Sequence, residues 1–377
     1  MKPMAQKCLT FIKKESILCI AGMLAVLSAC IIPPSAAYLD YLDLRVLALL
    51  FCLMLVVAGL QSIGTFSCLG QRLLSGTKSL RQLALVLVSL CFFTSMFITN
   101  DVALITFVPF SVLMLTMAKA EDYLIPVIVL QTIAANLGSM LTPIGNPQNL
   151  YLYSAFSLGM GQFLLYMLPL SLAALLLLFA SIRLLPRQSL AAVSQNKESK
   201  LPVKRLLIYL SLFLICLGCV IRLLPWPVML ALLIIACLVI DRQLFARVDY
   251  MLLLTFVFFF IFIGNMERIP AVASLLERLI HGRELWLGVL LSQCISNVPA
   301  AILLSGFTDQ VRPLLYGINI GGLGTLIASL ASVISYRAYC KTEGAQKGRY
   351  LKTFTLYSLF FLVPLLLLAQ VLLYGFQ

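Results

Sequence analysis

The chain has 377 residues, of which 62% are hydrophobic and 11% charged, and its mean hydropathy is +1.05. Apolar runs of roughly twenty residues, the length that a helix needs to cross a bilayer, recur along nearly the whole sequence and leave no room for a soluble domain. We therefore expect an all-α polytopic membrane protein. The formal net charge of +13 does not indicate a nucleic-acid partner, because Lys and Arg accumulate in the cytoplasmic loops of membrane proteins.

The N-terminal apolar run has two interpretations. Lys13-Lys14, the apolar run 17–32 and Pro33-Pro34-Ser35-Ala36-Ala37 together resemble a cleaved signal peptide. The run is somewhat long for that, and the next segment behaves as the following span. We predict a first helix at about 16–33 and keep cleavage as the alternative.

Residues 1–182 are expected to form an N-terminal repeat. A second helix is predicted at about 45–66, followed by a linker that contains Arg72. Polar interruptions within apolar sequence define the remaining segments. These segments are a hairpin at about 83–117, interrupted at Thr99-Asn100-Asp101, a broken helix at about 123–158, and a helix at about 162–182.

A polar cytoplasmic loop at 183–204 separates this repeat from a C-terminal repeat at 205–377. The second repeat has the same order of segments and one extra helix. Its segments are helices at about 205–222, 226–240 and 250–266, a polar stretch from Glu267 to Glu284, a hairpin at about 285–308, a broken helix at about 313–336, and a last helix at about 353–375.

The basic residues indicate how the chain is threaded. If the N-terminus is cytoplasmic and both hairpins are re-entrant, all but six of the 27 Lys and Arg lie in cytoplasmic loops. The exceptions are Arg45, Arg222, Arg268, Arg278, Arg283 and Arg312. The first hairpin is long enough for two short spans, but the second is not. We therefore predict inverted repeats with about nine spanning helices plus two hairpins, and an external C-terminus.

Two polar motifs, Asn136-Leu-Gly-Ser-Met-Leu-Thr-Pro-Ile-Gly-Asn146 and Asn319-Ile-Gly-Gly-Leu-Gly-Thr-Leu-Ile-Ala-Ser329, align without a gap. Each lies inside an apolar segment, where glycine, proline and small amides weaken a helix and free its backbone polar groups. Hydrocarbon cannot satisfy those groups, so they must face protein or a water-filled cavity. A pair of such interruptions in corresponding halves of a chain indicates a transporter binding site.

The hairpin tips and helix breaks are expected to meet at the membrane midplane. Their hydroxyls and amides can both donate and accept hydrogen bonds, and half-helix N-termini favour an anion. The candidate substrate- and ion-binding residues are Thr99, Asn100, Asp101, Thr142, Gly145, Asn146, Asn149, Ser296, Asn297, Gly324, Thr325 and Ser329. The sequence predicts no metal site, no catalytic residue and no cofactor beyond a coupling ion, H⁺ or Na⁺.

Asp101 is the acidic side chain that we place in the membrane interior, where a charge is costly and indicates function by default. The alternative role is a helix N-cap before Val102-Ala-Leu-Ile. Asn100 and Asn297 have an alternative role as turn residues that tolerate the left-handed region. The prolines of 142–147 have an alternative role as a packing kink.

At these tips and breaks the chain resembles the ion transporter superfamily, which includes arsenite efflux permeases, sodium/proton antiporters and divalent anion:sodium symporters. Thr-Asn100-Asp101-Val-Ala-Leu is similar to the Asn-Asp-x-Ala-Leu pattern of arsenite permease-like anion transporters, the closest group. The segments 135–149, 296–300 and 319–325 resemble the family's first break, second hairpin tip and second break. The resemblance covers roughly residues 43–375.

The resemblance implies a mobile transport domain of hairpins and broken helices that slides against a scaffold, and it implies a homodimer. The Ser-Asn-Thr tips of the symporters are here Thr99-Asn100-Asp101 and Ser296-Asn297-Val298. The carboxylate at Asp101 therefore favours proton coupling. The family moves arsenite, citrate, succinate, sulfate, silicate and sodium, so the substrate does not follow from the resemblance.

We therefore predict a secondary active transporter in the plasma (inner) membrane that moves a small anion or related solute by a proton-coupled, elevator-like mechanism. The alternatives are a sodium/proton antiporter or a sodium-coupled dicarboxylate symporter of the same fold. A lipid-modifying enzyme would need a cluster of acidic or histidine side chains that Asp101 alone does not supply. A passive channel fits two symmetric breaks less well than alternating access does.

Overall fold

The computed structural model describes residues 15–74, 79–189 and 201–375. Within these ranges the regular structure is helical, apart from an isolated bridge between Ser79 and Ser189. A helix satisfies its backbone polar groups within its own segment, which is what apolar surroundings require. The expected all-α polytopic membrane protein is confirmed.

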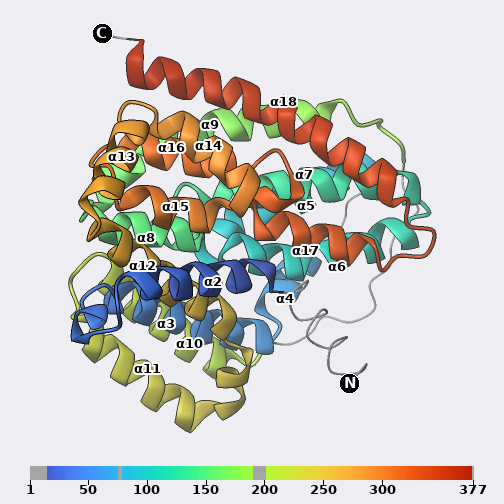
Figure 1. Cartoon of the computed structure of the whole chain (residues 1–377). Helices are drawn as coiled ribbons and strands as arrows, with labels where there is room; N and C mark the ends of the chain where they lie inside the picture. The colour runs from blue at the N-terminus through green and yellow to red at the C-terminus, as the bar shows by residue number, and fades with distance from the viewer. Residues whose placement is uncertain (1–14, 75–78, 190–200, 376–377) are drawn as a thin grey trace, which may run out of the picture.

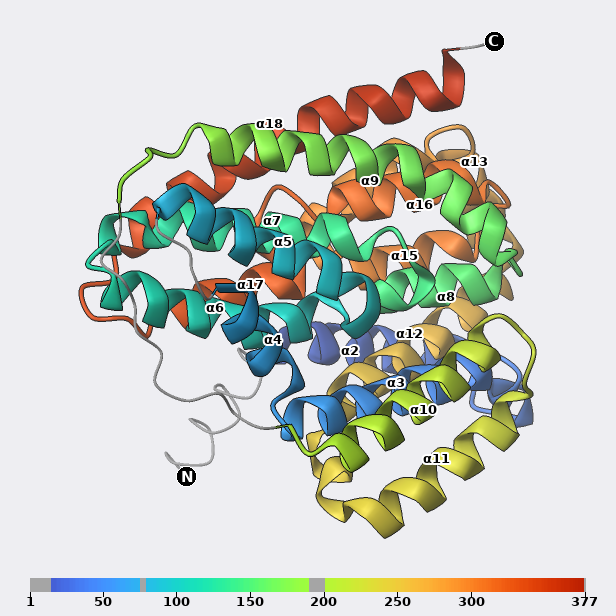
Figure 2. The ribbon, with the colours of Figure 1, turned by 180° about the vertical axis from the view of Figure 1, so that it is seen from behind.

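The lower layer in Figures 1 and 2 packs helices from both halves of the chain. Its helices are α2 (Ser16–Ile31), α3 (Leu44–Ser62), α10 (Val203–Val220), α11 (Trp226–Ile240) and α12 (Tyr250–Glu267). α2 packs on α12, and α10 and α11 pack on α3.

The upper layer contains the hairpins and the broken helices. Its helices are α5 (Leu80–Ile98), α6 (Asn100–Met117), α7 (Leu124–Ser139), α8 (Pro147–Ala155), α9 (Met160–Arg183), α14 (Glu284–Ile295), α15 (Asn297–Ser305), α16 (Val311–Gly321), α17 (Leu330–Tyr339) and α18 (Lys347–Tyr374). Figure 1 shows α5, α6, α7 and α17 on the right and α8, α14, α15 and α16 on the left. The two hairpins, α5–α6 and α14–α15, therefore enter the layer from opposite ends.

Each hairpin turns at one residue with a positive φ angle. Thr99 has φ 71° and ψ 151°, and Ser296 has φ 77° and ψ 155°. This backbone region is essentially reserved for glycine, so each tip stores strain of about 1–3 kcal/mol. Asn100 and Asn297 follow as the first residues of α6 and α15. The alternative that these asparagines adopt the left-handed turn is therefore wrong, because the residue before each of them does so.

Both predicted helix breaks are present. Residues 140–146 between α7 and α8 include the short 3-10 turn η3 (Pro143–Gly145). Residues 322–329 between α16 and α17 include η5 (Leu326–Ala328). Each break follows a run of small or amide residues and ends where the second half-helix starts.

Two helices lie where the sequence analysis expected only a linker and a polar stretch. They are α4 (Thr65–Leu74) and α13 (Pro270–Ile280). Each connects the lower layer to a hairpin, α4 from α3 to α5 and α13 from α12 to α14. Both are amphipathic, so their charged residues make the segment look polar although one face remains apolar. They occupy equivalent places in the two halves.

The set of membrane-spanning helices also differs from the prediction. Among the described residues, eight helices are long and apolar enough to cross a membrane, and they include both α5 and α6. They leave out α2 and α11, which are apolar but have 16 and 15 residues. They also leave out the broken helix α16–α17. By length and composition the first hairpin can be two spans, so its re-entry stays a prediction.

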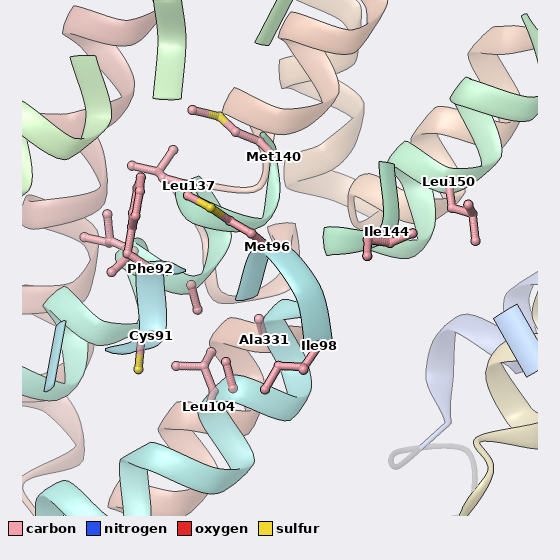
Figure 3. Close-up of a cluster of buried hydrophobic side chains, with 14 of the residues drawn as sticks. Cys91, Phe92, Met96, Ile98, Leu104, Leu137, Met140, Ile144, Leu150 and Ala331 are labelled. Carbon is pink, nitrogen blue, oxygen red and sulfur yellow. The ribbon is translucent and has the colours of Figure 1, made fainter. Parts of the chain in front are cut away.

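Apolar side chains surround the point where the first hairpin meets the first break. Figure 3 shows Phe92 and Met96 of α5 close to Leu137 and Met140. All four side chains are at most 7% exposed. This shell packs apolar side chains against the first tip and the first break.

The closest approach within the upper layer depends on glycine. A β-carbon at Gly138 of α7 would overlap the carbonyl oxygen of Phe92 on α5. At the equivalent place in the second half, a β-carbon at Gly321 of α16 would lie 2.8 Å from Oγ of Ser292 on α14. Small residues at these contacts let the helix backbones approach closely.

We expect Gly138→Ala to destabilise the protein by about 1–3 kcal/mol, because the added methyl group has no room beside a backbone carbonyl. Thermal unfolding in detergent measures the effect as a lowered melting temperature. Gly161→Ala in α9 is the matched control, since nothing lies within 4 Å of a β-carbon there. Equal melting temperatures for the two variants would contradict the close packing of α5 on α7.

Candidate functional site

The two tips and the two breaks meet in a buried cluster of amides and hydroxyls. Asn136, just before the first break, accepts hydrogen bonds at Oδ1 from two sides. Asn100 Nδ2 of the first hairpin tip donates at 2.9 Å, and Ser329 Oγ of the second break donates at 2.9 Å. One amide oxygen therefore joins both halves of the chain.

Asn319, the residue equivalent to Asn136, makes the corresponding contacts in the second half. Its Oδ1 lies 3.4 Å from Nδ2 of Asn146 in the first break, and its Nδ2 donates to Oδ1 of Asn149 at 2.7 Å. Asn146 Nδ2 also donates to Oγ of Ser139 at 3.1 Å. Each asparagine before a break therefore bonds to the opposite break, as an inverted repeat would produce.

The freed backbone of the first break is satisfied from within the same broken helix. Nδ2 of Asn149 points at the carbonyl oxygens of Ser139, Met140 and Thr142, with the shortest distance, 3.2 Å, to Met140. Oδ1 of Asn146 accepts from the backbone N–H of Asn149 at 2.9 Å and so caps α8. This is the satisfaction that an apolar environment requires.

The second break is satisfied by the hairpin instead. Gln293 of α14 donates from Nε2 to the carbonyl oxygens of Gly321 at 2.8 Å and Leu323 at 2.9 Å. Its Oε1 accepts from the backbone N–H of Thr325 at 2.9 Å. The residue at the equivalent place in α5 is Met96, which has no such group. Gln293 of the second hairpin therefore binds its break through hydrogen bonds that the Met96 side chain cannot make in the first.

The predicted threonines join each break to its own hairpin in the same way. Oγ1 of Thr142 donates to the carbonyl oxygen of Met96, and Oγ1 of Thr325 donates to that of Gln293 at 3.3 Å. The predicted glycines fit tight places in the breaks. A β-carbon at Gly145 would overlap the carbonyl oxygen of Ser139, and Gly324 has φ +111° beside Gln293.

The remaining residues of the second tip are buried but less connected. Ser296 Oγ lies 3.5 Å from the carbonyl oxygen of Ala328. Asn297 is 4% exposed and lies against Gly322. Thr325 is exposed, although it was predicted to face a central site. The predicted residues of the first half therefore make more of the hydrogen bonds in the cluster than those of the second.

A cavity of about 290 Å³ opens beside this cluster, between the two layers. Thr99, Asp101 and Asn146 of the predicted site line it. Its other walls come from α3, the loop before α12, and the start of α17. The helices α6, α8 and α17 all begin at this cavity. Their N-terminal ends place partial positive charge around it.

Asp101 has an unusual environment in this cavity. Its Oδ1 is buried and has no hydrogen-bond partner among the described residues. Asp101 is the second residue of α6, and the N-cap position belongs to Thr99. The alternative that Asp101 is the N-cap is therefore wrong. A carboxylate with a buried, unpaired oxygen is costly in a membrane interior, which favours a group that gains and loses a proton or a cation.

Sequence reasoning missed several members of the cluster. Asn136 and Asn319 were part of the aligned motifs but were not among the predicted site residues. Their recurrence at the same position of both motifs was the available signal. Gln293 is a polar residue in a helix whose other residues are mostly apolar, which was a weaker signal. Nothing in the sequence indicated that Asp249 lines the same cavity as Asp101.

Apolar helices that enclose two polar breaks define a polytopic membrane protein of the transporter class. The chain belongs to the citrate transporter family, whose model matches residues 9–313. The predicted membership of the ion transporter superfamily is therefore confirmed. The protein is a membrane transporter of this family.

Three relatives are similar to this chain, and two of them are named transporters. An uncharacterized transporter of Methanocaldococcus jannaschii is 34% identical over 73% of this chain and 75% of its own length. The inner membrane protein YbiR of Escherichia coli K12 is 32% identical over 87% of this chain and 86% of its own length. The silicon efflux transporter LSI3 of Oryza sativa subsp. japonica is 33% identical over 36% of this chain and 27% of its own length.

We expect Gln293→Leu to destabilise the protein and to impair transport, because the carbonyl groups of the second break lose their donors at about 1–3 kcal/mol for each unsatisfied group. Thermal unfolding and transport in proteoliposomes measure the two effects. Gln162→Leu is the control, since Gln162 is exposed and bonds only to Tyr166 among the described residues. If Gln293→Leu matched this control, the hairpin would not support the break.

Proposed function

We propose that the protein is a secondary active transporter that moves a small anion or related solute through proton-coupled alternating access. The observation that carries the proposal is the cluster in which Asn136 and Asn319 bond across the two halves, next to the unpaired carboxylate of Asp101. Such polar convergence between repeats is typical of transporter binding sites.

The hydrogen bonds favour an elevator-like movement over separate opening of a hairpin. Thr142 and Asn100 bind the first hairpin to its broken helix, and Gln293 binds the second. The layers themselves meet through fewer polar contacts, such as Gln61 to Thr106 at 3.3 Å. We propose that the upper layer moves as one body along the lower layer, with α4 and α13 as the connecting arms.

The positive-inside rule supports an inverted arrangement of the two repeats. In the proposed threading, α5–α6 enters from the cytoplasm and α14–α15 from outside as re-entrant hairpins. The N-terminus is then cytoplasmic and the C-terminus external. The name of the relative YbiR, an inner membrane protein, supports a location in the cell inner membrane. A homodimer is also proposed, on the family resemblance alone.

The chemistry of the site favours a small oxygen-rich substrate. Amides and hydroxyls dominate the cluster, and three helix N-termini face the cavity. Arg247 is the one basic residue among the described residues that line it. The family name refers to citrate and one relative is a silicon efflux transporter. Citrate and silicic acid are therefore the first substrates to test in proteoliposomes, each with an imposed proton or sodium gradient.

We expect Asp101→Asn to abolish transport driven by a proton gradient while the melting temperature stays near that of the wild type. The amide keeps the size of the side chain but cannot exchange a proton. The measurement is uptake of labelled citrate or silicic acid into proteoliposomes. Asp122→Asn, in the short 3-10 turn before α7, is the control. Transport that depends on sodium and ignores the proton gradient would favour the sodium-coupled alternatives.

Asn100→Ala and Asn297→Ala should both reduce the rate of the same uptake by at least about tenfold, if each amide binds the anionic substrate, since a lost hydrogen bond to a charged group is worth about 1.5–3 kcal/mol. Both residues begin the second arm of a hairpin. A loss in only one variant would argue against a site shared by the two repeats.

A further inference from the structure

The cavity beside the polar cluster contains a second carboxylate. Asp249, at the N-cap of α12 in the lower layer, lines the same space of about 290 Å³ as Asp101 in the upper layer. We propose that Asp249 is a proton-relay residue that exchanges protons between Asp101 and the aqueous solution. This inference rests on the proposed proton coupling at Asp101.

The two carboxylates differ in their exposure. Asp101 lines the cavity together with Asn146 and Thr99, and its Oδ1 is buried without a partner among the described residues. Asp249 is exposed to solvent. Its Oδ1 accepts from the backbone N–H of Leu252 at 3.0 Å, which fixes the side chain.

The charges around the cavity are few. Among the described residues that line it, the charged ones are Asp101, Arg247 and Asp249. The wall from α3 contributes the neutral amide of Gln61, and the wall from α17 contributes Leu330 and Ile334. The cavity is large enough for several water molecules, and its carboxylates and amides give them partners. Asp249 is thus the carboxylate available on the route from Asp101 to solution.

Aromatic side chains that do not line the cavity pack across the boundary between the layers. The ring of Tyr151 on α8 packs against Phe256 and Phe260 on α12, with centroids 6.2 and 5.7 Å apart. The guanidinium of Arg222 lies 6.0 Å from the ring centroid of Tyr153. These packed side chains leave the end where α12 begins, with the exposed Asp249, as the proposed entry for water.

The relay step conserves protons. The carboxyl group of Asp101 gives its proton to cavity water, which becomes hydronium. The hydronium passes a proton to the carboxylate of Asp249, which then releases it to solution. Loading of Asp101 follows the same path in reverse.

The test compares two aspartates of one loop. Asp249→Asn keeps an Oδ1 that can accept from Leu252, because Asn caps a helix as well as Asp does, but it cannot carry the proton. Asp241→Asn is the matched control. Asp241 Oδ1 caps η4 (Arg242–Arg247) by accepting from Gln243 at 3.0 Å, and the residue does not line the cavity.

We expect Asp249→Asn to slow proton-driven uptake by only about tenfold, because cavity water still carries some protons. A general acid or base that acts directly on a reacting bond contributes more than this. The probe is citrate or silicic acid, whichever the wild type transports, and its KM should not change. Imidazole, a small proton carrier, should restore the rate. Asp249→Glu should also restore it, and Asp241→Asn should behave as the wild type.

A second measurement requires no substrate. After a pH jump on detergent-solubilised protein, an indicator dye follows proton uptake, and the part that Asp101→Asn removes belongs to Asp101. The proton uptake assigned to Asp101 should be slower in Asp249→Asn. If it keeps the wild-type rate while Asp101→Asn still abolishes transport, the relay is overturned and the proposed function stands. If Asp101→Asn transports normally, the proposed function itself fails.

Discussion

Backbone polar groups in an apolar interior must find partners within the protein, and the structure around both helix breaks follows from this requirement. Where α7 ends, the side-chain amide of Asn149 donates to the free carbonyl groups of the first break. Where α16 ends, Gln293 performs the same role from a neighbouring helix. Without such donors, two interruptions in the middle of apolar helices would be too costly to keep.

The two ways of satisfying the freed carbonyl groups have different consequences. Asn149 belongs to the broken helix that it supports, so the first break is self-contained. Gln293 belongs to the second hairpin, so α14 cannot leave α16 without exposing the freed carbonyl groups of the break. Because Asn136 and Asn319 also bond across the halves, the tips and breaks form one polar unit. Among the described residues, hydrogen bonds across the layers are few, such as those of Gln61 with Thr106 and Ser154 with Asp43.

Strain and charge are concentrated at the same place. Thr99 and Ser296 hold backbone angles that suit glycine, and Asp101 carries a buried oxygen without a partner among the described residues. Strained backbone and unpaired charge persist only where the surrounding fold over-determines them, and they cluster at functional sites. Asp249 of the lower layer lines the same cavity between the layers as Asp101, and its side chain is exposed to solvent.

The sequence by itself determined the membrane class, the family, the order of the membrane helices and both breaks. The hydrocarbon core constrains each segment locally, so a span is visible as a long apolar run and a break as polar residues within that run. It did not reveal α4 and α13, because the polar and charged residues on one face of each helix made the segment look like a loop. It also did not show that the hairpins turn at Thr99 and Ser296. The tertiary structure alone decided which side chains meet: Gln293 with the second break, Ser329 with Asn136, and Asp249 with the cavity of Asp101. These partners lie far apart in the chain, and only the packing of the helices brings them within reach of one another.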